Sequence, residues 1–167
     1  NIHFTYLGTG CIFTDACPED TCGYNEDDLP NFTGSGYSTV KGFTDRLMHM
    51  FDASTPNVRI RMPIVGETND RNFITKISKY TKVVNIQNSM TVLPELLPIM
   101  IDLATKKETG TVNLTNPGTI SHNEILDLYQ KYVDPDFKYC SDTNPEWMDI
   151  ETLKAWIKEN QSKIGKI

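Results

Sequence analysis

The spacing of apolar and polar residues predicts several short strands along the chain. Residues 2–7 are rich in aromatic and β-branched side chains and lead into a Gly-Thr-Gly turn, which is typical of a strand that ends at a tight turn. Residues 58–63 alternate between apolar and basic side chains and predict a second strand. Short apolar runs at 83–86 and 112–114 predict two more, the second of them buried.

Between these runs the apolar residues recur every three or four positions, which is the period of a helix face. Residues 37–51 predict the longest amphipathic helix, with Ser35 as its N-cap. Further helices are expected at 70–80 and at 92–105. Pro98 lies inside the second of these and requires a kink or a later start, because proline removes a helix hydrogen bond.

The C-terminal third predicts two more helices. The tetrapeptide Ser-His-Asn-Glu at 121–124 is a capping box that opens a helix reaching about Tyr132, and residues 149–159 predict another. Strands that alternate with helices favour an α/β fold on a largely parallel sheet. Residues 14–36 have the composition of a loop, and a loop of that length in a compact domain is more often functional than idle.

Composition favours one globular domain that contacts neither membrane nor nucleic acid. The chain has 167 residues, of which 38% are apolar and 23% charged, enough for a single core. Its longest apolar runs are far shorter than the ~20 residues of a membrane helix, and no signal peptide opens it, so we expect a soluble cytoplasmic protein. The formal charge of −6 includes no basic block for a nucleic-acid backbone. An anionic ligand therefore needs a local site, and the four cysteines match no usual zinc spacing.

Tyr37 and Lys41 are four positions apart at the start of a predicted helix, so their side chains share one face. An ammonium group beside a phenol favours the phenolate, which suits a general acid in carbonyl reduction. An ordinary aromatic residue and a solvated lysine satisfy the same spacing. No G-x-G-x-x-G phosphate turn occurs in the sequence, so we expect that the chain begins in the middle of a nucleotide-binding fold or never bound a dinucleotide.

Six longer segments, covering the chain to about Lys138, are more specific than this spacing. They are GTGCIF (8–13), PNFTGSGYSTVK (30–41), RMPI (61–64), RNFITKISKY (71–80), VVNIQNSMTVLPELLPI (83–99) and NLTNPGTISHNEIL (113–126). Together they resemble the extended short-chain dehydrogenase/reductase family. Within it they are most similar to the bifunctional nucleotide-4-keto-6-deoxyglucose 3,5-epimerase/4-reductases that make nucleotide-L-rhamnose.

This resemblance implies the second half of a Rossmann-like extended fold, with its C-terminal substrate-binding part. Residues 1–167 would then be one catalytic and substrate-binding portion, with the N-terminal dinucleotide-binding half absent from the sequence. The family implies NADPH as cofactor, a nucleotide-sugar substrate (UDP- or dTDP-linked) and a homodimer in the full enzyme. The family usually carries an arginine in a loop near the C-terminus that holds the nucleotide diphosphate, whereas residues 139–148 contain none.

The resemblance also implies roles for individual residues. Thr9 would hydrogen-bond the C4 carbonyl of the sugar, Tyr37 would protonate its oxygen, and Lys41 would assist Tyr37 and hold the nicotinamide ribose. Inverting C3 and C5 requires an acid and a base on opposite faces of the ring. Cys11 and Lys76 stand at the positions of the family's epimerising pair, although Cys11 also suits a small buried side chain and Lys76 a surface lysine.

Six further residues match positions that bind ligands in the family. Three would line the nicotinamide pocket, namely Arg61, Met62 and Pro63. Three would contact the nucleotide-sugar, namely Asn72, Phe73 and Asn88, although Phe73 is also suited to the core.

Two other functions fit part of the same pattern. The related GDP-4-keto-6-deoxymannose epimerase/reductases, which make GDP-fucose, share the hydroxyl-x-Cys and Tyr/Lys features but usually place a histidine where Lys76 stands. A non-catalytic binding module derived from the same fold would tolerate the loss of Cys11 or Tyr37.

Overall fold

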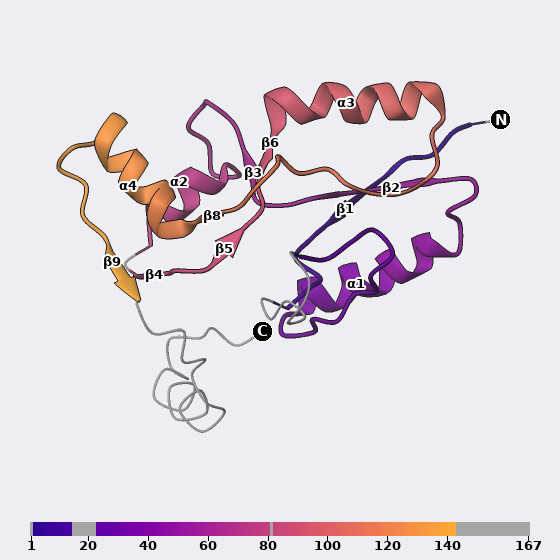
Figure 1. The fold of residues 1–167 in the computed structure, drawn as a ribbon, viewed down its shortest axis with the longest axis horizontal. Coiled ribbons are helices and arrows are strands. Elements are labelled where there is room, and N and C mark those ends of the chain that lie inside the picture. The colour runs from indigo at the N-terminus through magenta and orange to yellow at the C-terminus, as the bar shows by residue number, and fades with distance from the viewer. Residues whose placement is uncertain (1, 15–22, 81, 143–167) are drawn as a thin grey trace.

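Three parallel strands form the central sheet of the chain, a computed structural model of which describes residues 2–14, 23–80 and 82–142 (Figure 1). The strands are β1 (Tyr6–Thr9), β2 (Pro56–Ile60) and β7 (Gly110–Asn113), in the order β1-β2-β7. Tyr6 lies opposite Asn57, and Pro56 lies opposite Gly110. The predicted α/β architecture with a parallel sheet is therefore confirmed.

Two long helices cover opposite faces of this sheet, as Figure 1 shows. They are α1 (Gly36–His49) and α3 (Leu93–Lys106). Successive strand residues point to opposite faces. Val58 accordingly packs with Leu96 of α3 and with Leu114, while its neighbours Asn57 and Arg59 bond to Asp45 of α1.

The face of α1 that meets the sheet is polar. Ser38, Gly42 and Asp45 are its buried residues, whereas Val40 and Phe43 are 65% and 70% exposed. The amphipathic period of the sequence is present, but the apolar stripe lies on the outer side of the helix. The reason is that β2 offers Asn57 and Arg59 to this side, and a carboxylate pairs with them.

A second region is built from two helices and three short strand pairings. The helices are α2 (Phe73–Ile77) and α4 (His122–Tyr132). The pairs are β3 (Pro63–Ile64) with β6 (Thr91–Val92), β4 (Lys82–Val84) with β9 (Cys140–Asp142), and β5 (Gln87–Asn88) with β8 (Ile120–Ser121), of which only the last is antiparallel. Their common core, called here the second cluster, consists of Ile77, Val83, Met90, Ile125 and Leu126.

Several predicted boundaries are wrong for identifiable reasons. The strand expected at 58–63 is split, because Met62 takes a left-handed conformation (φ 43°) and redirects the chain into β3. The helix expected at 70–80 begins at Phe73, because the side chain of Asn72 accepts the N–H of Ile74 and caps it there. The strand expected at 2–7 is shifted to Tyr6–Thr9, where β2 supplies its partners.

The helix termini were predicted more accurately. Ser35 caps α1 by accepting the N–H of Ser38, and Ser121 with Glu124 forms the capping box of α4. Helix α3 begins at Leu93 and continues through Pro98, so the later start is wrong. The helix predicted at 149–159 lies outside the described residues. Within the described ranges, no helix is long and apolar enough to cross a membrane.

Candidate functional site

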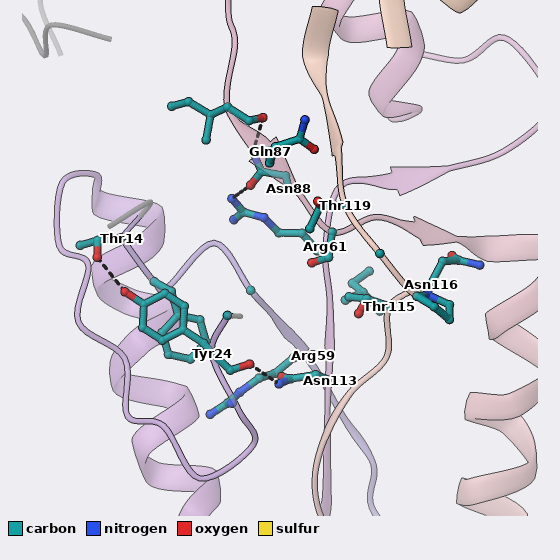
Figure 2. A pocket seen from close by; sticks show the side chains of 18 of the residues that line it. Thr14, Tyr24, Arg59, Arg61, Gln87, Asn88, Asn113, Thr115, Asn116 and Thr119 are labelled. Atoms are coloured by element: carbon teal, nitrogen blue, oxygen red, sulfur yellow. Dashed lines mark hydrogen bonds between the residues drawn. The ribbon is translucent and has the colours of Figure 1, made fainter. Parts of the chain in front are cut away.

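A pocket of about 1040 Å³ opens at the carboxyl ends of the three parallel strands (Figure 2). Strand β1 leads into it at Gly10, the end of β2 and the residue after it contribute residues 59–61, and β7 ends in it at Asn113. Ligands of α/β proteins bind at this edge of the sheet. The other described lining residues come from segments 13–14, 23–24, 85–89 and 115–119.

Uncharged polar groups dominate the described lining of the pocket. Segments 85–89 and 115–119 supply amides and hydroxyls, among them Gln87 and Asn116, which Figure 2 labels. The charged side chains among the described lining residues are those of Arg59 and Arg61. Amides bind sugar or phosphate oxygens without adding charge, and a guanidinium group attracts an anion. Arg59 is paired with the carboxylate of Asp45 on α1, whereas Arg61 bonds to Asn88 within the pocket lining.

Arg61 and Asn88, two of the predicted ligand-binding residues, meet in this pocket although they are 27 positions apart. The Nη2 of Arg61 donates to the Oδ1 of Asn88 at 2.5 Å. The Nδ2 of Asn88 donates to the carbonyl oxygen of Ile86 at 3.2 Å, and the backbone N–H of Arg61 donates to the Oγ1 of Thr91 at 2.9 Å. These bonds hold the guanidinium and amide groups in fixed positions at the pocket.

Thr9 and Cys11 flank Gly10, which lines the pocket at the end of β1. Thr9 is buried, and its Oγ1 accepts the backbone N–H of Cys11 at 3.1 Å. The N–H of Gly10 donates to the carbonyl oxygen of Ile60 at 2.9 Å, which ties the turn to β2. Cys11 is half-buried and carries a free thiol. The structure thus brings the hydroxyl and the thiol-bearing residue to one turn at the pocket's edge.

Tyr37 and Lys41 lie on the first two turns of α1 and are not among the pocket-lining residues. Tyr37 is 57% exposed. The Nζ of Lys41 donates to the hydroxyl of Tyr6 at 3.1 Å and lies 5.0 Å from the centre of that ring. Lys41 is therefore held against β1 through Tyr6, a residue that the sequence patterns did not single out.

The remaining predicted residues lie beside the second cluster rather than in the described pocket lining. Asn72 is buried and donates from its Nδ2 to the carbonyl oxygens of residues 65 and 67, at 2.9 and 2.8 Å. Phe73 packs against His122, with ring centres 5.4 Å apart. Met62 packs against the second cluster, and Lys76 lies exposed on α2.

Pro63, the last of the predicted set, pairs with Thr91 in the short β3–β6 ladder. Among the described residues, no hydrogen bond or ion pair joins Lys76 to Cys11 or Tyr37 to Thr9. The roles of these residues in binding and catalysis stay predictions.

Comparison with known proteins agrees with the resemblance seen in the sequence. A protein of Acanthamoeba polyphaga mimivirus is 56% identical over 169 residues, which cover 100% of this chain and 58% of the relative. An Arabidopsis thaliana trifunctional UDP-glucose 4,6-dehydratase/UDP-4-keto-6-deoxy-D-glucose 3,5-epimerase/UDP-4-keto-L-rhamnose-reductase is 52% identical over 165 residues, covering 96% of this chain and 24% of that enzyme. The chain is homologous to one part of the rhamnose synthases.

Solved structures support the same relationship. The UDP-rhamnose synthase of Acanthamoeba polyphaga mimivirus superposes with a TM-score of 0.78 at 55% identity, over 84% of this chain and 50% of that one. The dTDP-4-dehydrorhamnose reductase of Bacillus anthracis, solved with NADP, has the same fold, with a TM-score of 0.61 at 21% identity over 83% of this chain and 49% of that one. No model of a known protein family matches the chain.

Three pocket residues escaped the sequence analysis. Phe13 and Tyr24 stack with ring centres 4.3 Å apart, and Asn113 donates from its Nδ2 to the carbonyl oxygen of Tyr24 at 3.2 Å (Figure 2). Asn113 had a usable signal, since polar residues that directly follow a parallel strand point to the ligand edge. The two aromatic residues had none, because they lie in irregular segments with no period.

Proposed function

We propose that the chain is the catalytic and sugar-binding part of an NADPH-dependent enzyme that makes nucleotide-L-rhamnose. Its substrate is a nucleotide-linked 4-keto-6-deoxyglucose, which it epimerises at C3 and C5 and reduces at C4. The observation that carries this proposal is the 52% identity, over 96% of the chain, to an enzyme named for both reactions. The chain corresponds to only 24% of that enzyme, so the activity belongs to a larger assembly of which this chain is one part.

In the proposed epimerisation, Cys11 and Lys76 act on opposite faces of the sugar ring. The thiolate of Cys11 removes the proton from the carbon next to the C4 carbonyl, and the electron pair moves onto the carbonyl oxygen to form an enolate. The hydroxyl of Thr9 donates a hydrogen bond to that oxygen. Lys76 then returns a proton to the carbon from the opposite face, which inverts the centre and restores the ketone.

In the proposed reduction, Tyr37 protonates the C4 oxygen while Thr9 keeps it in place. When bound, NADPH supplies the hydride. The nicotinamide end of such a cofactor fits the residues described, since Tyr37 and Lys41 offer a phenol and an ammonium group one helical turn apart for ribose hydroxyls. The sequence holds no glycine-rich phosphate turn for the other end, so we propose that another part of the enzyme binds it.

The pocket supports a nucleotide-sugar as the substrate. Arg61 offers a positive group to a diphosphate, and Asn88 and Gln87 offer amides to sugar or phosphate oxygens. The chain as a whole is negatively charged, so an anionic ligand needs a local positive group. We propose that Arg61 supplies it.

The proposal is tested by joining the chain to the part of the mimivirus UDP-rhamnose synthase that it does not cover and assaying UDP-4-keto-6-deoxyglucose with NADPH. We expect UDP-rhamnose from the joined protein and no turnover from the 167 residues alone. Tyr37→Phe should slow NADPH oxidation by about 10²- to 10⁴-fold but leave solvent deuterium uptake at C3 and C5 intact. Cys11→Ser should abolish that uptake. Turnover by the chain alone, or full activity of both variants, would refute the proposal.

A non-catalytic binding module is the competing function, and the same joined protein separates the two. Such a module would bind UDP with equal affinity in the wild type, Tyr37→Phe and Cys11→Ser, and would release no product from any of them. Product formation by the wild type that both substitutions reduce excludes it.

A further inference from the structure

Arg59 is a fully buried charged residue that the proposed chemistry does not use. It lies on β2, is 1% exposed, and forms a two-bond pair with Asp45 of α1. Its Nε donates to the Oδ2 of Asp45 at 2.8 Å, and its Nη2 donates to the Oδ1 at 2.7 Å. The Nε2 of His49 lies 2.8 Å from the same Nη2, so this helix face encloses the guanidinium group on one side.

On its other side Arg59 binds the backbone of residues 24–28, called here the wall segment because Tyr24 lines the pocket. Its Nη1 donates to the carbonyl oxygens of Asn25 at 3.3 Å and Glu26 at 3.2 Å. Its Nη2 donates to the carbonyl oxygen of Asp28 at 3.2 Å. The wall segment has no helix or strand of its own, and besides Arg59 it has a turn in which the N–H of Asp28 donates to the carbonyl oxygen of Asn25 at 3.2 Å.

The same arginine supports the aromatic part of the wall. The guanidinium carbon of Arg59 lies 5.2 Å from the centre of the Phe13 ring, and that ring stacks on Tyr24. Strand β7 adds a second support, because the N–H of Asn113 donates to the Oε1 of Glu26 at 2.9 Å. Two residues of the sheet therefore hold the wall segment, Arg59 of β2 through three carbonyl oxygens and Asn113 of β7 through Tyr24 and Glu26.

Stability alone does not require a charge at this place. A buried ion pair is often no more stabilising than a well-packed apolar pair of similar volume, because both charges lose their hydration. An apolar side chain, however, cannot donate to the three carbonyl oxygens that Arg59 binds. We propose that Arg59 is a positioning residue that fixes the wall segment, and with it Phe13 and Tyr24, as one wall of the pocket.

The proposal deepens the proposed function by stating what sets the pocket's shape, and it rests on that function only for the identity of the ligand. Its test compares two double variants of the whole chain that lose the same two charges. Arg59→Gln/Asp45→Asn removes the buried pair without leaving an unpaired charge. Lys106→Gln/Asp102→Asn removes an exposed pair on α3, at 2.6 Å, and serves as the control.

Two measurements read out the result, namely amide hydrogen exchange and UDP binding by titration calorimetry. In Arg59→Gln/Asp45→Asn we expect exchange at the N–H groups of Asn25 and Asp28, which close the turn of the wall segment, to accelerate by about tenfold or more relative to α3, because the turn loses the bonds from Arg59 that hold it. We expect the Kd for UDP to rise by about fivefold or more, which corresponds to the loss of about one contact in the pocket. The control should change neither quantity more than about twofold.

A third variant separates positioning from charge pairing. Arg59→Lys keeps the positive charge beside Asp45, but a single ammonium group cannot reach all three carbonyl oxygens. If Arg59 only neutralises Asp45, lysine restores slow exchange in the wall segment. If it positions the segment, exchange stays fast.

The outcomes that overturn the proposal differ from those that overturn the proposed function. Unchanged exchange at residues 25–28, uniform acceleration across the whole sheet, or an unchanged Kd despite a freed wall segment would each reject a positioning role for Arg59. Failure of the wild-type chain to bind UDP would instead count against the proposed function, and the exchange measurement would still decide the role of Arg59.

Discussion

The two regions of the molecule bury different kinds of groups. Where α1 meets the sheet, the buried groups are polar, with Asp45, Asn57 and Arg59 all at 1% exposure or less. Where α2 and α4 meet, the buried groups are the five apolar residues of the second cluster. The pocket takes residues from both sides, since Arg59 comes from the first region and segment 85–89 from the second.

The contrast shows that burial serves different ends in the two regions. Apolar packing is non-directional, so the second cluster stabilises the fold without dictating where each backbone group lies. Hydrogen bonds to a buried ion pair have definite geometry, so the interface of α1 determines the position of the wall segment. The wall segment of the pocket is therefore held by the polar interface between α1 and β2, and not by apolar packing.

The largest effect should come from breaking the polar interface on one side only. Asp45→Ala leaves the guanidinium group of Arg59 buried without its carboxylate, and we expect a loss of about 3–5 kcal/mol in the free energy of unfolding. Urea denaturation measures the loss. Asp102→Ala, at an exposed ion pair on α3, is the control and should change the free energy by less than about 1 kcal/mol. Equal losses in the free energy of unfolding would show that the buried polar interface matters no more to stability than an exposed ion pair.

A somewhat smaller loss should follow from a cavity in the second cluster. Leu126 is 0% exposed, and Leu126→Ala should lower the free energy of unfolding by about 2–4 kcal/mol through lost burial and the space left behind. Leu128→Ala, two positions along the same helix and 47% exposed, should cost less than about 1 kcal/mol. If Leu126→Ala accelerates amide exchange in the wall segment while α4 stays protected, the wall segment depends on the second cluster, and the contrast between the two regions is wrong.

The N-terminus of α4 should contribute less than either interface. Ser121→Ala removes the acceptor for the N–H of Glu124, at 3.2 Å, and should lower stability by about 1 kcal/mol. Ser54→Ala, at an exposed position, should change it by less than about 0.5 kcal/mol. Thermal unfolding followed by circular dichroism compares them, and equal shifts in Tm would show that the capping box adds nothing.

The smallest effect concerns the pH dependence of the second region. The backbone N–H of Ser121 and then the amide of Gln87 lower the pKa of Glu124 below its ordinary value of 4.5. The folded state thus favours the carboxylate. Its contribution to stability is present above the unfolded-state pKa and is lost as the pH falls through the lower folded-state value.

Glu124→Gln should therefore be less sensitive to acid than the wild type, with the difference confined to pH values below about 4.5. Urea midpoints measured across that range test this expectation. Glu108→Gln, which removes one carboxylate from an exposed position after α3, is the matched control. A parallel shift of both variants at every pH would attribute the effect to net charge.

Local chemistry explains which elements could be predicted. Ser35 and Ser121 cap the helices that their positions predicted, because a cap is decided by a few neighbouring residues. The orientation of α1 could not be predicted in the same way, because Asp45 is a polar residue on a helix whose apolar stripe suggested another buried face. Its burial depends on Arg59, fourteen positions away on β2.

The same distinction between local patterns and distant contacts applies to the candidate site. Tyr37 and Lys41 were singled out by their spacing, and the structure places both at the start of α1. Thr9 and Cys11 were singled out by the family resemblance, and they lie at the end of β1 and in the turn that follows it. The bond between Arg61 and Asn88 and the support of Tyr24 by Asn113 join residues 27 and 89 positions apart. No motif contains both partners of such a contact.

The amino-acid sequence by itself determined the kinds of elements, their caps and the resemblance to the rhamnose synthases, because periodicity, capping and motifs depend on residues close together in the chain. Only the tertiary structure decided which face of α1 is buried, that the chain turns at Met62 after β2, and that the buried Arg59 bonds to the backbone of the wall segment. Those features depend on which groups compete for burial and for hydrogen bonds once distant segments meet, and that competition has no counterpart in a local pattern.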